Sequence, residues 1–138
     1  MPRVAEEGPS QAAPAQHAGV LLVVDDERSI RELLRRLLER AGYRVLTAAH
    51  GGEALERFEE AGGAIDLVIT DVRMPEMSGP ELADRLLALR RSVKILYISG
   101  YAAPLLAPHD PFGVRTVFLQ KPFTSAALLG KVKEMVGG

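Results

Sequence analysis

Short apolar runs alternate with helical patterns along this sequence, and this alternation constrains the fold more than any other feature. The first run, Val20–Val24, has no polar residue, which is typical of a strand buried on both faces of a sheet. Further runs at residues 44–48, 67–70, 93–98 and 116–120 predict four more strands. Between and after them, apolar residues recur every three or four positions, which predicts amphipathic helices.

An alternation of strands and helices predicts an α/β fold with a parallel sheet, right-handed crossovers and helices on both faces. For five strands we expect a flavodoxin-like (βα)5 doubly wound sandwich with strand order 2-1-3-4-5, which binds ligands at the carboxyl ends of its strands. Residues 19–138 are enough for one such domain. Residues 1–18 mix Ala, Pro, Gly and Gln without periodicity, which predicts a disordered tail or linker.

The helices differ in how clearly the sequence marks them. The first and third helices are expected to bury their leucines, Leu33 and Leu89 included. Ser78 precedes Glu81 by three positions, which predicts a capping box at the start of the third helix. Three prolines fall within residues 100–115, where the fourth helix is expected. Because proline interrupts helix interiors, we predict a shortened or irregular fourth helix there.

Composition limits the classes of function. The formal net charge of −1 gives no long-range field that would attract nucleic acid or an anionic membrane surface. The absence of cysteine excludes disulfides, thiolate nucleophiles and cysteine-based metal sites. No apolar stretch approaches the roughly 20 residues needed to cross a bilayer, so we expect a cytoplasmic protein without membrane insertion. No output domain follows Gly138, so direct nucleic-acid binding is not expected.

Polar residues follow the predicted strands at the ends where this fold binds ligands. They are Asp25 and Asp26 after the first strand, Asp71 after the third, Ser99 after the fourth and Lys121 after the fifth. Because the first and third strands are neighbours in the predicted order, three carboxylates should converge and repel one another. A Mg²⁺ ion would remove that repulsion, since it prefers oxygen ligands and commonly binds carboxylates together with a phosphate. We therefore expect Asp71 to attack a phosphoryl group whose oxygens contact Lys121 and Ser99.

Four motifs in this order resemble the receiver domain of two-component response regulators over residues 19–138. The motifs are Asp25-Asp26, Asp71-Val72-Arg73-Met74-Pro75 with Gly79, Ser99-Gly100-Tyr101, and Lys121-Pro122-Phe123. The last two, with the residues that flank them, are similar to the receivers of hybrid histidine kinases. The resemblance implies a phosphoacceptor module of a signalling system or phosphorelay, which takes a phosphoryl group onto Asp71 from a histidine kinase or a histidine phosphotransfer protein.

The resemblance also implies roles for single residues. It implies a Mg²⁺ site at Asp25, Asp26, Asp71 and the main-chain carbonyl of Arg73, in which Asp26 binds the ion directly and Asp25 mostly through water. It implies conformational switch positions at Ser99 and Phe118, and a cis peptide bond between Lys121 and Pro122. Arg73 and Tyr101 lie two residues beyond Asp71 and Ser99, so we expect them to cover the phosphoryl group and slow its hydrolysis, and we include Tyr101 in the switch.

Two other functions fit parts of this pattern. A Mg²⁺-dependent phosphatase of the haloacid dehalogenase type also uses an aspartyl nucleophile. Such enzymes carry a DxD pair after the first strand and usually a cap domain, whereas this chain has the adjacent pair Asp25-Asp26 and no spare length for a cap. The second alternative, a phosphorylation-independent binding module, would not need an intact acidic cluster. We therefore expect a self-modifying domain and not an enzyme that turns over a small substrate.

Several residues have simple structural interpretations. An Asp-Asp pair alone is more often a turn or a helix cap than a metal site, and only its combination with Asp71 and Lys121 favours chemistry. The arginines of the first helix alternate with glutamates and are most simply a solvated face, with a docking role for the first turn around Ile30 as the alternative. His50 lies in a predicted loop and receives no role.

Overall fold

The structure, a computed structural model, describes residues 19–62, 64–99 and 116–136. The predicted tail at residues 1–18 and the predicted irregular fourth helix, together with Tyr101, lie outside these residues. Five parallel strands form one sheet, and they are β3 (Val20–Val24), β4 (Arg44–Ala48), β5 (Leu67–Asp71), β6 (Ile95–Ser99) and β7 (Thr116–Gln120).

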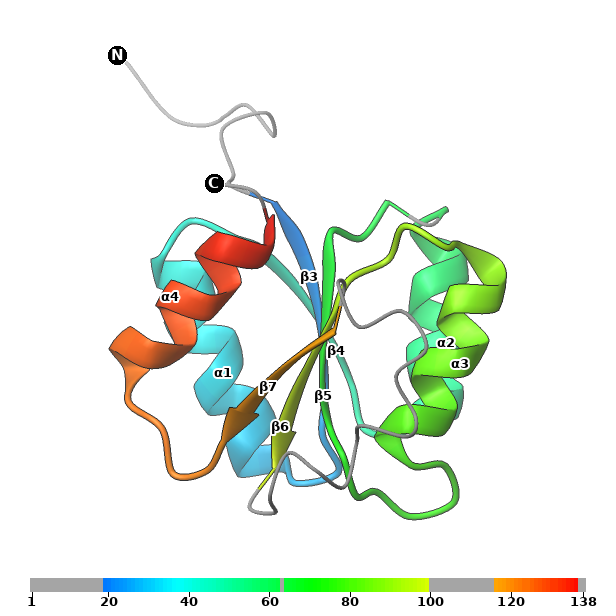
Figure 1. Cartoon of the computed structure of the whole chain (residues 1–138), viewed down its shortest axis with the longest axis horizontal. Coiled ribbons are helices and arrows are strands. Elements are labelled where there is room, and N and C mark those ends of the chain that lie inside the picture. The colour runs from blue at the N-terminus through cyan, green and yellow to red at the C-terminus, as the bar shows by residue number, and fades with distance from the viewer. Residues whose placement is uncertain (1–18, 63, 100–115, 137–138) are drawn as a thin grey trace.

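The strand order is the one expected for a five-stranded doubly wound fold. Across the sheet it runs β4-β3-β5-β6-β7, which is 2-1-3-4-5 when the strands are counted along the chain. β3 and β5 are neighbours, with Val24 opposite Thr70. All strands run in the same direction, so their carboxyl ends lie at one edge of the sheet, the lower edge in Figure 1. The flavodoxin-like fold is therefore confirmed.

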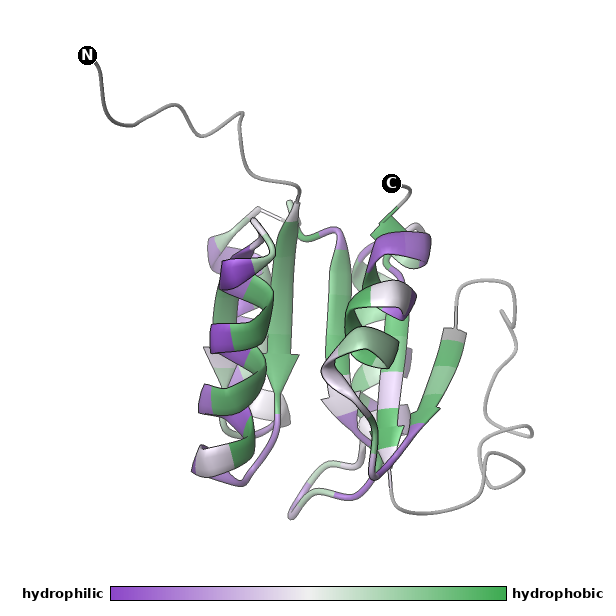
Figure 2. Ribbon diagram, turned by 90° about the vertical axis from the view of Figure 1, so that its left-hand side faces the viewer, coloured by the Kyte–Doolittle hydropathy of each residue, from purple (hydrophilic) through white to green (hydrophobic). Residues whose placement is uncertain are grey.

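Helices cover both faces of the sheet (Figure 1). The helices α1 (Arg28–Arg40) and α4 (Ser125–Val136) lie on one face, and α2 (Gly51–Glu60) and α3 (Gly79–Leu89) lie on the other. Hydrophobic residues fill the strands and the inner sides of the helices, while hydrophilic residues lie on the outer sides of the helices (Figure 2). Within the described residues, no helix has the length and apolar character that a membrane span requires.

The continuous apolar runs of the sequence follow from this sandwich. Alternate residues of one strand enter different core clusters, so that Leu22 and Val24 pack on the α2–α3 side while Leu21 and Val23 pack on the α1–α4 side. Each of these four side chains is at most 1% exposed. Because a strand with both faces covered offers no solvent-facing position, it has no polar residue to break the run.

The fourth strand begins later than the sequence predicts. It spans Ile95–Ser99, whereas the apolar run at residues 93–98 places it two residues earlier and ends it before Ser99. Val93 is buried, but its amide donates to the carbonyl of Arg90 at 3.2 Å, in the turn that follows α3. The apolar run therefore includes a core residue of the preceding turn, and Ser99 belongs to the strand.

The predicted cap of α3 is present, and side chains also cap α4 and α2. Ser78 and Glu81 form the expected capping box of α3, and the Thr124 hydroxyl accepts a hydrogen bond from the third residue of α4 at 3.0 Å. The absence of a role for His50 was wrong. Its Nδ1 accepts a hydrogen bond from the amide of Glu53 at 3.1 Å, so the imidazole caps α2.

The expected burial of Leu33 and Leu89 was also wrong, because these side chains are 50% and 53% exposed. The buried stripe of α1 runs through Leu34 and Leu38, and Leu33 is rotated by about 100° from Leu34 around the helix axis. Leu89 is the last residue of α3, two positions beyond Leu87, the last residue of this helix that is buried in the core. A leucine near a helix end or beside a narrow stripe fits the helical spacing without reaching the core.

Candidate functional site

The three aspartates of the first two motifs meet at the carboxyl edge of the sheet. Asp25 follows β3 directly and Asp71 ends β5, and the register of these neighbouring strands places Val24 opposite Thr70. One carboxylate oxygen from each of Asp25, Asp26 and Asp71 lies within 4.8 Å of the other two. We call these three residues the acidic cluster. The structure thus brings together the carboxylates that the sequence predicts to converge.

Asp25 is the most buried member of the acidic cluster, at 2% exposed. Burial raises the pKa of its carboxyl to about 6, and the negative charge of Asp71 contributes in the same direction. A hydrogen bond from the amide of Glu27, at 2.9 Å, lowers this pKa in part. Deprotonated carboxylates that crowd one space favour a small divalent cation, so the donor set fits an oxygen-ligated metal ion.

Asp71 has partners on both carboxylate oxygens. Its Oδ1 accepts a hydrogen bond from the amide of Arg73 at 3.3 Å, and its Oδ2 lies 3.4 Å from the Lys121 ammonium. Its side chain is 14% exposed. The amide of Lys121 donates to the carbonyl of Ser99 at 2.7 Å, which fixes the end of β7 to the end of β6. The Lys121-Pro122 bond is cis, as the resemblance implies.

Ser99 and Phe118, the two described residues that are predicted as switch positions, lie on neighbouring strands. Ser99 ends β6, is 1% exposed and pairs with Gln120 in the ladder. Tyr97, two residues earlier, pairs with Phe118, and both face the α2–α3 side of the sheet. Phe118 is half-buried against that core. Ser99 therefore lies diagonally across from Phe118 on the same face, while Tyr101 lies outside the described residues.

Sequence reasoning missed two residues that support the aspartates. Thr70 is 1% exposed, and its hydroxyl donates to the carbonyl of Asp71 at 3.0 Å. Arg31 on α1 donates from Nη1 to the carbonyl of Asp25 at 2.8 Å, so it is not simply part of a solvated face. A threonine within a strand carries no signal for such a contact, and the periodicity of α1 does not distinguish Arg31 from its other arginines.

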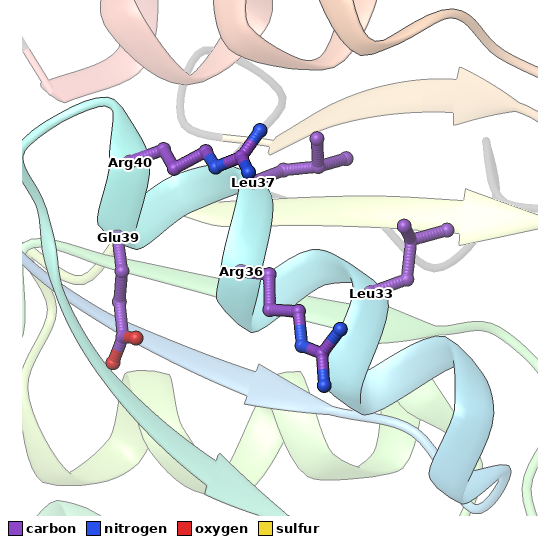
Figure 3. Close-up of a pocket in the computed structure, with 5 residues that line it drawn as sticks. All are labelled: Leu33, Arg36, Leu37, Glu39 and Arg40. Atoms are coloured by element: carbon purple, nitrogen blue, oxygen red, sulfur yellow. The ribbon is translucent and has the colours of Figure 1, made fainter.

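The remaining surface of interest is the outer side of α1 (Figure 3). Leu33, Arg36, Leu37, Glu39 and Arg40 line a shallow hollow there. We call this set the α1 surface. Arg35, between them, is held by ion pairs to glutamates on the same helix at 2.7 and 2.9 Å. By contrast, Arg36 and Arg40 form no ion pair with any residue in the described part of the chain. The α1 surface is therefore both apolar and positively charged.

Comparison with known proteins agrees with this geometry. The family model of the response regulator receiver domain matches residues 21–133. The chain is 40% identical over 131 residues to the sensor kinase CckA of Brucella abortus, covering 95% of this chain and 14% of CckA. This chain thus spans about a seventh of the length of that relative.

Two solved structures are similar over most of the chain. The receiver domain of the hybrid histidine kinase CckA has a TM-score of 0.73 at 37% identity and covers 86% of this chain and 99% of that one. The response regulator TrrA of Thermotoga maritima, in complex with Mg²⁺ and BeF, has a TM-score of 0.74 at 36% identity and covers 85% of this chain and 98% of that one. The chain therefore belongs to the receiver domain family of two-component response regulators and hybrid histidine kinases.

Proposed function

We propose that this domain takes a phosphoryl group from a phosphohistidine of a partner protein onto the carboxylate of Asp71. The observation that carries the proposal is the meeting of Asp71 with two further carboxylates and the Lys121 ammonium at one edge of the sheet. In the transfer, an Asp71 oxygen attacks phosphorus and the P–N bond to the imidazole breaks. The electron pair of that bond goes to the imidazole nitrogen, which solvent protonates. The products are an aspartyl phosphate and a neutral histidine.

The acidic cluster and the carbonyl of Arg73 would hold a Mg²⁺ ion. Three carboxylate oxygens within 4.8 Å of one another match the preference of Mg²⁺ for hard oxygen ligands. When bound, the ion supplies positive charge that offsets the carboxylates and the phosphoryl oxygens. The similar TrrA structure is a complex with Mg²⁺ and BeF, which supports the same cation here.

Lys121 and Ser99 would act on the oxygens of the phosphoryl group. The Lys121 ammonium lies 3.4 Å from Asp71 Oδ2, close enough to follow a phosphoryl group carried by that carboxylate. The Ser99 hydroxyl belongs to the strand end next to Asp71, since Asp71 pairs with Ile98 in the ladder. Hydrolysis later restores the carboxylate when water attacks phosphorus, the P–O bond to Asp71 breaks and inorganic phosphate leaves.

The switch would use the pairing of β6 with β7. A phosphoryl group adds roughly −1.5 to −2 charge and strong acceptor oxygens, so it attracts the Ser99 hydroxyl and the Lys121 ammonium. Movement of the end of β6 changes the space beside Phe118, which lies diagonally across from Ser99 on the same face. The phosphoryl group then shifts the balance between two arrangements of Phe118 because it contacts them differently.

The phosphohistidine would come from a histidine kinase or a histidine phosphotransfer protein. The α1 surface is a docking site for such a partner, because Leu33 is 50% exposed and Arg36 and Arg40, which form no ion pair among the described residues, lie on the same surface (Figure 3). A partner helix with apolar and acidic side chains complements this surface. α1 begins four residues after Val24, so its first turn lies beside the acidic cluster, and the α1 surface begins at Leu33, in the next turn. A partner helix that lies along α1 and extends past its first turn therefore reaches the phosphoacceptor.

The test is phosphorylation of the Asp71→Asn variant by a small acyl phosphate, followed by intact-protein mass spectrometry. We expect wild-type protein to gain the mass of one phosphoryl group when Mg²⁺ is present and to gain none after Mg²⁺ is chelated. The Asp71→Asn variant should gain no mass in either condition. Asp84→Asn is the matched control, because Asp84 is exposed on α3 and the substitution changes the same charge. Labelling of Asp71→Asn at the wild-type rate would show that the nucleophile is another residue.

A further inference from the structure

The loop between β5 and α3, residues 72–78, is part of the phosphoacceptor site. Its Arg73 amide donates to Asp71 Oδ1 at 3.3 Å, and the carbonyl of Arg73 is the main-chain ligand in the proposed Mg²⁺ shell. The start of the loop is attached to the sheet, because the Val72 amide donates to the carbonyl of Ile98 at 3.3 Å. Its end returns to the start, because the Gly79 amide donates to the carbonyl of Val72 at 2.8 Å.

The middle of this loop rests on the first residue of α2. A Cβ atom placed on Gly51 would lie 2.5 Å from Met77 Sδ and 3.1 Å from Met77 Cβ and Cγ. Gly51 is buried, and Met77 is half-buried against the α2–α3 core. The next residue, Gly52, is exposed, and a Cβ there would meet only the His50 ring, at 3.4 Å or more. Of these two adjacent glycines, only Gly51 faces the loop.

The backbone just before Met77 adopts a conformation that needs support. Glu76 has a φ of 70°, in the left-handed region that non-glycine residues rarely adopt, and the Met77 amide donates to the carbonyl of Pro75 at 2.7 Å. Such a turn persists only when surrounding contacts hold it. The contact of Met77 with Gly51 is one that comes from outside the loop.

We propose that Gly51 is a positioning residue for the phosphoacceptor site, acting through Met77. Because Gly51 has no side chain, Met77 can pack against the start of α2 and hold the loop there. This packing fixes the position of the Arg73 main chain relative to Asp71. A methyl group at Gly51 would overlap Met77 Sδ and press on Met77 Cγ, so the Met77 side chain cannot keep this contact and the loop shifts. Mg²⁺ demands near-octahedral geometry, so its affinity falls when the ligand atoms move by more than about 0.5 Å from their best positions.

This inference rests on the proposed function, and its test compares Gly51→Ala with Gly52→Ala. The readouts are the Mg²⁺ dissociation constant by titration calorimetry and the amide chemical shift of Arg73 in metal-free protein. We expect Gly51→Ala to weaken Mg²⁺ binding by roughly 10-fold, at the low end of effects from residues that orient metal ligands. We also expect it to shift the amide resonance of Arg73. Gly52→Ala should leave both readouts unchanged. Both substitutions exchange glycine for alanine in the same helical turn, so propensity effects are shared.

A second substitution tests the contact itself. Met77→Ala removes the Sδ and Cγ atoms that a methyl group at Gly51 would strike, so the double variant should bind Mg²⁺ more tightly than Gly51→Ala alone. By itself, Met77→Ala should weaken binding and shift the Arg73 amide, because the packing against α2 is lost. This single variant decides the matter if Gly51→Ala does not fold.

Three results would overturn the inference. In the first, Gly51→Ala binds Mg²⁺ as tightly as wild-type protein. In the second, Gly51→Ala and Gly52→Ala lose the same Mg²⁺ affinity. In the third, the double variant binds Mg²⁺ no more tightly than Gly51→Ala. Failure of the proposed function gives a different result, because wild-type protein itself would then bind no Mg²⁺ and accept no phosphoryl group. In that case the Arg73 amide shift in metal-free Gly51→Ala still tests whether Gly51 positions the loop.

Discussion

Replacing Gly79 by alanine should lower the stability of the domain and distort the proposed phosphoacceptor site. Gly79 is the buried first residue of α3. A Cβ atom there would lie 2.4 Å from the carbonyl oxygen of Asp71 and 3.1 Å from Val72 Cα. Both are main-chain atoms, so no side-chain rotation makes room. The start of α3 and the end of β5 must separate by about 1 Å to reach ordinary contact distance.

The size of the effect follows from two opposing terms. Overpacking a well-packed interior typically costs about 1–3 kcal/mol, and the higher helix propensity of alanine returns at most about 1 kcal/mol. That return is small at Gly79, which is the first helical residue. We therefore expect Gly79→Ala to lower the free energy of unfolding by about 2 kcal/mol. Gly130 within α4 has nothing within 4 Å of its Cβ position, so Gly130→Ala should raise that free energy by about 0.5–1 kcal/mol.

Urea unfolding followed by far-ultraviolet circular dichroism measures both changes. With a slope of about 1–3 kcal/mol per molar urea, a loss of 2 kcal/mol lowers the midpoint by about 1 M. Gly79→Ala should also accept a phosphoryl group more slowly than wild-type protein, because the main chain of Asp71 moves. A midpoint for Gly79→Ala at or above that of wild-type protein would refute the steric reasoning, and so would a lower midpoint for Gly130→Ala than for Gly79→Ala.

Three further substitutions probe other features. Glu76 has a φ of 70°, and asparagine tolerates positive φ better than glutamate does. Glu76→Asn should therefore raise the free energy of unfolding by about 0.5–1 kcal/mol. An unchanged urea midpoint would contradict this prediction. Lys94 Nζ donates to the carbonyl of Met135 at the end of α4 and so caps this helix. Lys94→Met should lower the free energy of unfolding by about 1 kcal/mol and speed amide hydrogen exchange in the last turn of α4. Unchanged exchange would argue against a capping role for Lys94. Replacing Arg73 and Tyr101 together by alanine should speed release of inorganic phosphate from the phosphorylated domain, and equal or slower release would count against their covering role.

The fold could be predicted because each strand leaves a local signal. A parallel strand covered on both faces must be apolar along its whole length, and the runs at Val20–Val24 and in the third strand show this directly. The alternation of strands and helices indicated a parallel sheet with right-handed crossovers, and the strand order was taken from the arrangement that is common in five-stranded doubly wound sheets. The convergence of Asp25, Asp26 and Asp71 followed in turn, because residues after neighbouring parallel strands share one edge.

The faces and caps of the helices were less predictable. Helical spacing identifies a set of leucines on α1, but how many reach the core depends on the width of the contact with the sheet, which no local pattern contains. Leu33 therefore fits the spacing and is half exposed. His50 caps α2 although Ser, Thr, Asp and Asn are the usual capping residues, so its identity gave no signal.

The supports of the site lie furthest from what a sequence can indicate, because they join elements through a rotation that only the structure specifies. Successive helical residues point about 100° apart, so of two adjacent glycines only one can face the loop that carries Arg73. The sequence Gly51-Gly52 does not distinguish them, yet a Cβ on the first would lie 2.5 Å from Met77 and one on the second would meet only His50. Residues that perform chemistry must be of particular types, and these types can be recognised in order along the chain. A residue that positions them needs only the right size at one contact, and that requirement becomes visible when both partners are in place.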